Sequence, residues 1–198
     1  MFQLGSHKAL EPDGLPAFFY QLFWGIVKAD VINTVLAFFH FCSLFTPLNH
    51  TFITLIPKVP FLKEVTHFRP INLCNVIYKI ISKILVNRVK PLMDTLITPF
   101  QNAFINGRNI SNYILIAHEV LDVLRKRNGR KANFGMLKID MSKAYDRVNW
   151  TFLRAVLTAM KFGENWIKWI MKWVTSVSYT LLVNGNLTSS FKPSQRLR

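Results

Sequence analysis

The sequence has few acidic residues for its length. Its 198 residues include only 10 Asp and Glu against 25 Lys and Arg, which gives a formal net charge of +15 at pH 7. No acidic residue follows Glu164. The resulting positive electrostatic potential favours a polyanionic partner, either nucleic acid or an acidic membrane surface, and it disfavours a basic substrate.

Cysteine is also scarce. Cys42 and Cys74 are the only two, with no Cys-x-x-Cys spacing and no paired histidines. This excludes a disulfide scaffold and a structural zinc site, and it suits a reducing, intracellular compartment. No basic cluster makes a convincing nuclear signal, so nucleus and cytoplasm both stay open as locations.

Long uninterrupted apolar runs are missing too. The stretch between Asp30 and Lys58 carries no charge, but polar residues interrupt it and Pro47 ends its helical pattern. A membrane-spanning helix needs about 20 predominantly apolar residues. The stretch is therefore predicted to hold a buried helix, and no membrane partner is expected. The N-terminus also lacks the pattern of a secretory signal.

What the sequence does have is enough apolar material for a core, since 51% of the residues are hydrophobic. Apolar periodicity and turn residues predict helices and strands in alternation. The expected helices are 16–27, 30–45, 76–93, 110–127, 150–161 and 164–176. The expected strands are 51–57, 134–140 and a hairpin of 179–183 with 186–191 around Asn184-Gly185, a strong hairpin signal. The predicted class is α+β with more helix than strand.

Asp140 ends the apolar run 134–140. If this run is a strand, Leu137 and Ile139 share the buried face and Asp140 projects from the other one. Magnesium is commonly held by one or two carboxylates together with substrate phosphates, so Asp140 is a candidate Mg²⁺ ligand. The alternative is that Asp140 caps the next turn.

Six segments together resemble the reverse transcriptase of plant non-long-terminal-repeat (LINE-type) retrotransposons. Residues 137–150, LKIDMSKAYDRVNW, resemble the motif that carries the first catalytic aspartate of that family. The other matching segments, in the family's order, are 7–24, 48–59, 68–93, 101–120 and 169–185. The resemblance implies the fingers and palm of a right-hand polymerase, with residues 1–133 as N-terminal extension and fingers and 134–198 as a partial palm.

The resemblance also implies roles for individual residues. Asp140 would be the first metal-binding aspartate, with the backbone carbonyl of Met141 as a further Mg²⁺ ligand. Tyr145 would pack against the sugar of the incoming nucleotide and exclude a 2′-hydroxyl. Lys58 and Arg69 would contact the triphosphate, where a point charge and a planar fork neutralise phosphate. Taken alone, each of these two would be read as a solvated surface charge.

Further basic and polar residues are candidates for template contacts. Gln101, Asn102 and Arg108 match a motif that lies near template and nucleotide in the family. Lys79, Lys83 and Lys90 follow one side of the expected helix 76–93, opposite its isoleucines, and could track a template backbone. A basic helix face is also commonly just solvated. The tryptophans at 166, 169 and 173 are expected to be core.

Two departures from the family pattern stand out. Leu10-Glu11 replaces the usual Pro-Gly, which should perturb a tight turn and add a carboxylate beside a nucleic-acid channel. The motifs Gln-Gly-Asp and aromatic-Ala-Asp-Asp, which carry the other catalytic aspartates, do not occur in the 198 residues. The expectation is therefore a polymerase piece without the remaining palm, the thumb or any endonuclease, and without activity by itself.

The sequence thus favours part of an RNA-directed DNA polymerase whose partners are an RNA template, a DNA primer and deoxynucleoside triphosphates, with Mg²⁺ as cofactor in the intact enzyme. The alternative is a non-catalytic, sequence-independent nucleic-acid-binding module or a pseudogene relic, motivated by the charge and the absent aspartates.

Overall fold

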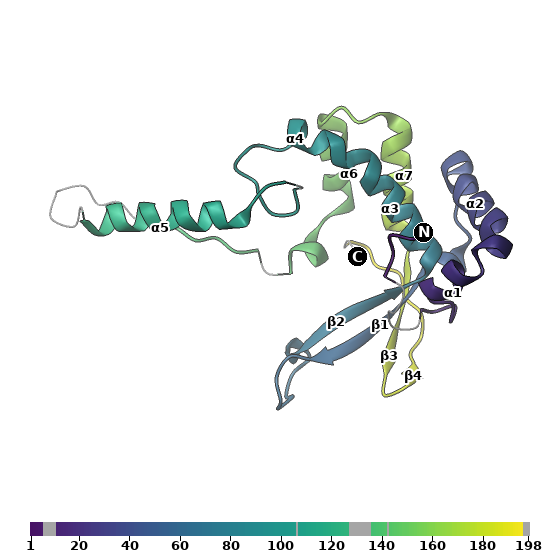
Figure 1. Cartoon of the computed structure of the whole chain (residues 1–198). Helices are drawn as coiled ribbons and strands as arrows, with labels where there is room; N and C mark the ends of the chain where they lie inside the picture. Colours follow the sequence, from purple (N-terminus) through teal and green to yellow (C-terminus); the bar gives the residue numbers. More distant parts are fainter. Residues whose placement is uncertain (6–10, 106, 127–135, 142, 196–198) are drawn as a thin grey trace. The chain divides into compact units, whose positions relative to one another are not determined.

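The computed structural model describes residues 1–5, 11–105, 107–126, 136–141 and 143–195 (Figure 1). The chain divides into two compact units, one formed by residues 1–85 and 143–198 and the other by residues 86–142. Helices outnumber strands in the described residues, and a four-stranded sheet lies in the first unit. The predicted α+β class is confirmed.

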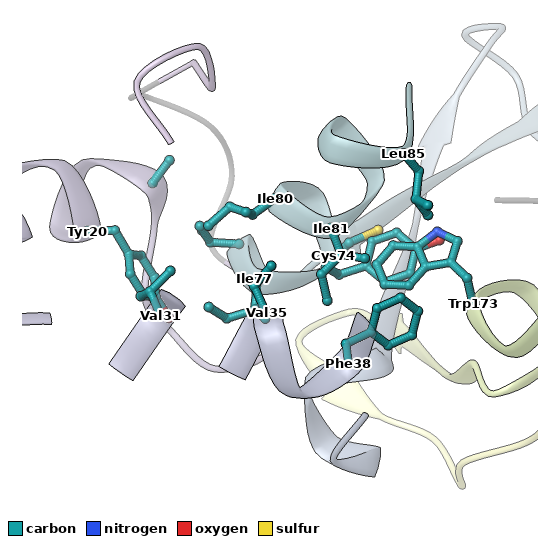
Figure 2. Close-up of a cluster of buried hydrophobic side chains, with 13 residues drawn as sticks. Tyr20, Val31, Val35, Phe38, Cys74, Ile77, Ile80, Ile81, Leu85 and Trp173 are labelled. Atoms are coloured by element: carbon teal, nitrogen blue, oxygen red, sulfur yellow. The ribbon is translucent and has the colours of Figure 1, made fainter. Parts of the chain in front are cut away.

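The helical core of the first unit forms where apolar residues recur at helical spacing. It contains α1 (Ala17–Leu22), α2 (Trp24–Phe41), the first part of α3 (Val76–Val89) and α7 (Glu164–Thr175). Helix α2 buries Val31, Val35 and Phe38, which lie at positions i, i+4 and i+7 on one face. Helix α3 supplies the isoleucine stripe predicted from the sequence, and its buried members include Ile77 and Ile81. Figure 2 shows these side chains meeting in one cluster.

Trp173 of α7 closes this cluster. Its indole ring is stacked on Tyr78 with ring centroids 3.6 Å apart and an interplanar angle of 15°, and it meets Phe38 edge-on at 5.7 Å. Trp169 is partly buried, and its indole N–H donates to the carbonyl of Phe39 at 3.0 Å. Trp166 also packs against the cluster. The prediction that the tryptophan stripe is core is confirmed.

The sheet has the strand order β2-β1-β3-β4. β1 (His50–Pro57) pairs antiparallel with β2 (Phe68–Cys74) and parallel with β3 (Ser178–Val183), and β3 pairs antiparallel with β4 (Asn186–Leu187). Ile53, Val177 and Tyr179 form a second, smaller core on one face of the sheet. β1 therefore joins two segments that lie more than 100 residues apart in the chain.

The predicted first strand and the hairpin turn are confirmed, but the second hairpin strand is shorter than the predicted 186–191, since β4 ends at Leu187 and Phe191 forms only an isolated bridge with Tyr179. Asn184 and Gly185 both have positive φ, 50° and 81°, as the two-residue turn between β3 and β4 requires. Strand β2 was not predicted, since Pro70 lies in its middle and proline removes a ladder donor. The strand accommodates Pro70 because β2 lies at the edge of the sheet.

Two predictions of secondary structure are wrong. The described part of the predicted strand 134–140 is not a strand: residues 136–141 have no regular secondary structure, and Leu137 and Ile139 are each 83% exposed. Residues 134 and 135 lie outside the described residues. A strand needs a hydrogen-bonded neighbour, and none of the described strands pairs with this run. The first two helices separate at Phe23 and not near residue 28, because Phe23 has non-helical dihedral angles and caps both helices.

The remaining helices follow the prediction closely. α3 ends at Val89, just before Pro91, and is followed by the 3₁₀ turn η3 (Lys90–Leu92) and by α4 (Met93–Leu96). The other elements are η1 (Thr46–Asn49), η2 (Val65–His67), α5 (Ile110–Lys126), η4 (Ala144–Arg147) and α6 (Trp150–Ala159). Among the described residues, no helix has the length and apolar character needed to cross a membrane.

A candidate nucleic-acid interface on the sheet

The strand register brings Lys58 and Arg69 to one face of the β1–β2 hairpin. Arg69 is the direct partner of Ile56, and the Lys58 N–H donates to the carbonyl of His67 at 2.8 Å. Side chains of directly paired residues share a face, and so do residues two apart on one strand. Lys58 and Arg69 are therefore diagonal neighbours, and both are exposed. The Lys58 ammonium also donates to the carbonyl of Thr66 at 3.2 Å.

The same face carries a hollow at the other end of β1. Its volume is about 350 Å³, and it is lined by Pro12, Asp13, Thr46, Pro47, His50, Phe52, Asn75 and Ser178. His50 and Ser178 are partners in the parallel register, and His50 Nδ1 lies 2.8 Å from the Ser178 hydroxyl. Sequence reasoning assigned no role to His50 or Ser178, because only the pairing of distant strands brings them together.

Asn75 stabilises the segments that line this hollow. Its side chain is almost fully buried; the amide donates to the carbonyls of Pro47 at 3.0 Å and Leu48 at 3.3 Å, and its oxygen accepts from the Asp13 N–H at 3.3 Å. One side chain thus ties the turn at residues 11–14 and the turn before β1 to the start of α3. Its place directly before a helix was the one sequence signal for such a role.

Lys79, a predicted template contact, forms an ion pair with Glu11. Its ammonium donates to Glu11 Oε1, and the Glu11 side chain is almost fully buried. Burial raises the pKa of Glu11 above its usual value of 4.5, and the hydrogen bond and charge of Lys79 offset part of that rise. The neighbouring Tyr20 has its pKa raised to about 12, through burial and through the carboxylates of Asp13 and Glu11.

Of the pair Leu10-Glu11, only Glu11 belongs to the described residues. The turn closes, since the Gly14 N–H donates to the Glu11 carbonyl at 2.9 Å and Gly14 takes a φ of 71°. The Glu11 carboxylate lies inside the first unit and not on an open surface. Lys83, one turn after Lys79 on α3, is exposed.

In the second unit, Arg108 binds its own loop. Its guanidinium donates to the carbonyls of Thr98 and Gln101, each at 2.6 Å, and of Ile97 at 3.3 Å, and it forms an ion pair with Asp94 at 3.2 Å. The polar neighbours are bonded locally as well: Gln101 Nε2 donates to the Ala103 carbonyl and Asn102 Nδ2 to the Asn109 carbonyl. Arg108 thus organises this loop, and Gln101 remains exposed.

The residues predicted to bind metal and the nucleotide sugar lie outside the α-helices and strands. Asp140 and Met141 are exposed in the stretch 136–141, which belongs to the second unit. Tyr145 belongs to the first unit, in η4, and is exposed. Within the described ranges, no three His, Cys, Asp or Glu side chains gather into a group that could hold a metal ion. The described residues therefore do not form a metal centre by themselves.

Comparison with known proteins identifies the class. Residues 56–198 match the family of the reverse transcriptase (RNA-dependent DNA polymerase), and this is more than half of the chain. The chain belongs to that family.

The chain is also similar to a protein of Xenopus laevis, the transposon TX1 uncharacterized 149 kDa protein. The two are 28% identical over 177 residues, and the alignment covers 89% of this chain. It covers only 13% of the relative, so the chain corresponds to a small part of that protein.

Proposed function

We propose that the chain is the template- and nucleotide-handling part of an RNA-directed DNA polymerase from a LINE-type retrotransposon. Membership of the reverse transcriptase family and the similarity to a transposon protein support this proposal. Residues 1–133 would form the N-terminal extension and fingers, and residues 134–198 the first part of the palm. The partners would be an RNA template, a DNA primer and deoxynucleoside triphosphates.

The observation that carries the proposal is the placement of Lys58 and Arg69. Both cations lie on one face of an exposed hairpin, at the end away from the core. Arginine offers a planar fork that binds two phosphate oxygens, and lysine offers a compact charge. Such a pair would bind the triphosphate of a nucleotide and stabilise negative charge that develops on it.

Asp140, Met141 and Tyr145 keep the roles that the family motif implies. The Asp140 carboxylate and the Met141 carbonyl would be ligands of Mg²⁺ in the longer enzyme, where the metal would stabilise charge on the phosphoryl group. Tyr145 would lie against the sugar of the nucleotide. The described residues contribute no cluster of carboxylates around Asp140, so we assign no catalytic step to this chain.

The proposal is tested by titrating dTTP into the 198-residue chain by calorimetry. We expect saturable binding that Lys58→Gln and Arg69→Gln each weaken by about tenfold or more, because a hydrogen bond to a charged group contributes about 1.5–3 kcal/mol. Lys172→Gln is the matched control, since Lys172 is an exposed lysine on α7. Equal affinities for all four proteins would refute the proposed nucleotide site.

A second candidate is a non-catalytic module that binds nucleic acid without regard to sequence. The net charge of +15 favours it, as does the lack of a metal-binding cluster in the described residues. Such a module would bind RNA and DNA through phosphates and show no saturable dTTP binding. The same titration therefore separates the two candidates.

A further inference from the structure

The connection between β1 and β2 presents apolar side chains to solvent. Phe61 is 84% exposed and Val65 is 81% exposed, and Val59 and Leu62 are exposed beside them. Single exposed apolar residues are ordinary, but four within seven residues form a local patch, and such patches mark contact sites.

Hydrogen bonds fix the shape of this connection. The His67 N–H donates to the Glu64 carbonyl at 3.1 Å, the Lys63 N–H donates to His67 Nδ1 at 3.2 Å, and the Thr66 hydroxyl donates to the Glu64 carboxylate at 3.0 Å. Together with the bond between Lys58 and His67, they close the tip of the hairpin. These bonds hold the chain on both sides of Phe61, at Lys58 and at residues 63–67, so a ligand that binds Phe61 would order only a short additional segment.

The charges around the patch indicate which kind of ligand it would bind. Lys58, Lys63 and Arg69 lie in or beside the connection, and the one carboxylate there, Glu64, accepts a hydrogen bond from Thr66. By contrast, the exposed Phe45 lies in a stretch of the chain without any charged residue. An aromatic ring surrounded by cations matches a ligand that combines flat rings with phosphates, which is the chemistry of a nucleic-acid strand.

We propose that Phe61 is a stacking site for an unpaired base of single-stranded RNA, with Lys63 at an adjoining phosphate. This inference rests on the proposed nucleic-acid binding and adds to it a particular residue and a preference for unpaired bases. A paired base has its faces covered by its neighbours in the helix, so a duplex without overhangs would gain little from Phe61. Base–aromatic stacking contributes enough that removal of the ring is measurable in a binding assay.

The test is fluorescence anisotropy of the 198-residue chain with two probes, a labelled single-stranded RNA and the same RNA in a blunt duplex. Phe61→Ala should weaken single-strand binding about fivefold or more, given the usual contribution of one stacked base. It should leave duplex binding within about twofold, and Phe61→Trp should restore single-strand binding. Phe45→Ala is the matched control, because Phe45 is 71% exposed and lies in a stretch of sequence without charged residues. Lys63→Gln should lower the slope of log binding constant against log salt concentration by about 1, the effect of one lost phosphate contact, whereas Phe61→Ala should leave this slope unchanged.

Each other outcome overturns the proposal in a recognisable way. If Phe61→Ala and Phe45→Ala bind alike, or if single strand and duplex lose affinity equally, Phe61 is not a stacking site although nucleic-acid binding stands. If the unmodified chain binds neither probe, the proposed function fails as well. If Phe61→Ala leaves RNA binding intact but reduces binding to phosphatidylserine vesicles, the patch contacts lipid.

Discussion

Replacement of Asn75 by alanine tests how the hollow on the sheet is held together. The Asn75 side chain makes three hydrogen bonds to two distant segments, and its amide nitrogen donates two of them. Alanine leaves the Asp13 N–H and the carbonyls of Pro47 and Leu48 without this partner at part-buried positions. We therefore expect Asn75→Ala to lower the free energy of unfolding.

The magnitude follows from counting these bonds. A typical intramolecular hydrogen bond contributes about 1 kcal/mol net, and a buried polar group left unpaired costs about 1–3 kcal/mol. Because three part-buried hydrogen bonds are lost and water can reach part of the vacated space, the expected loss is about 2–4 kcal/mol. That is a large fraction of the stability of an ordinary domain.

Asn75→Asp gives a sharper test because it keeps the shape and one acceptor. At neutral pH its carboxylate would face the carbonyls of Pro47 and Leu48, to which the native amide donates. We expect Asn75→Asp to be less stable than Asn75→Ala at pH 7, and to recover as the pH falls, since a protonated carboxyl can donate again.

The assay is urea-induced unfolding followed by circular dichroism, at pH 7 and under mildly acidic conditions. The reasoning is refuted if Asn75→Ala unfolds within about 0.5 kcal/mol of the unmodified chain, which is the effect of an ordinary surface substitution. It is also refuted if Asn75→Asp is as stable as the native protein at pH 7.

Three further predictions concern other residues. Burial raises the pKa of Glu11 in the folded state above 4.5, so protonation of Glu11 stabilises the folded chain. This contribution to the free energy of unfolding is fully present below pH 4.5 and is lost as the pH rises through the raised pKa. Glu11→Gln should remove it from the pH dependence of urea unfolding. Arg108→Lys should increase proteolysis between residues 97 and 102 and leave the salt dependence of RNA binding unchanged. If the slope of log binding constant against log salt concentration falls by about 1, Arg108 binds phosphate instead. Primer extension by the 198-residue chain on an RNA template should give no product, because the motifs with the other aspartates do not occur in it; templated incorporation of nucleotides would contradict this.

Local pattern was sufficient to predict several elements. The apolar stripe of α3, the short β-branched run of β1 and the Asn184-Gly185 turn are each encoded within a few residues, so the structure matches the expectation there. The tryptophans of α7 were also placed correctly, since their spacing puts them on one helical face.

What could not be predicted depends on partners distant in the sequence. Lys79 lies on a basic helix face, and nothing near it in the sequence indicates that its ammonium binds Glu11, 68 residues earlier. The pairing of His50 with Ser178 and the role of Asn75 as a tie between segments arise from contacts of the same kind. The run before Asp140 has strand-like composition, but composition does not supply a neighbouring strand.

The central claim is that this chain handles a nucleic-acid template, and one titration tests it directly. The affinity of the 198-residue chain for an RNA template annealed to a DNA primer would be measured by filter binding between about 50 and 200 mM salt. We predict that the logarithm of the binding constant falls steeply and linearly with the logarithm of the salt concentration, as released counterions require. Absence of binding, or an affinity that hardly changes over this range, would contradict the account.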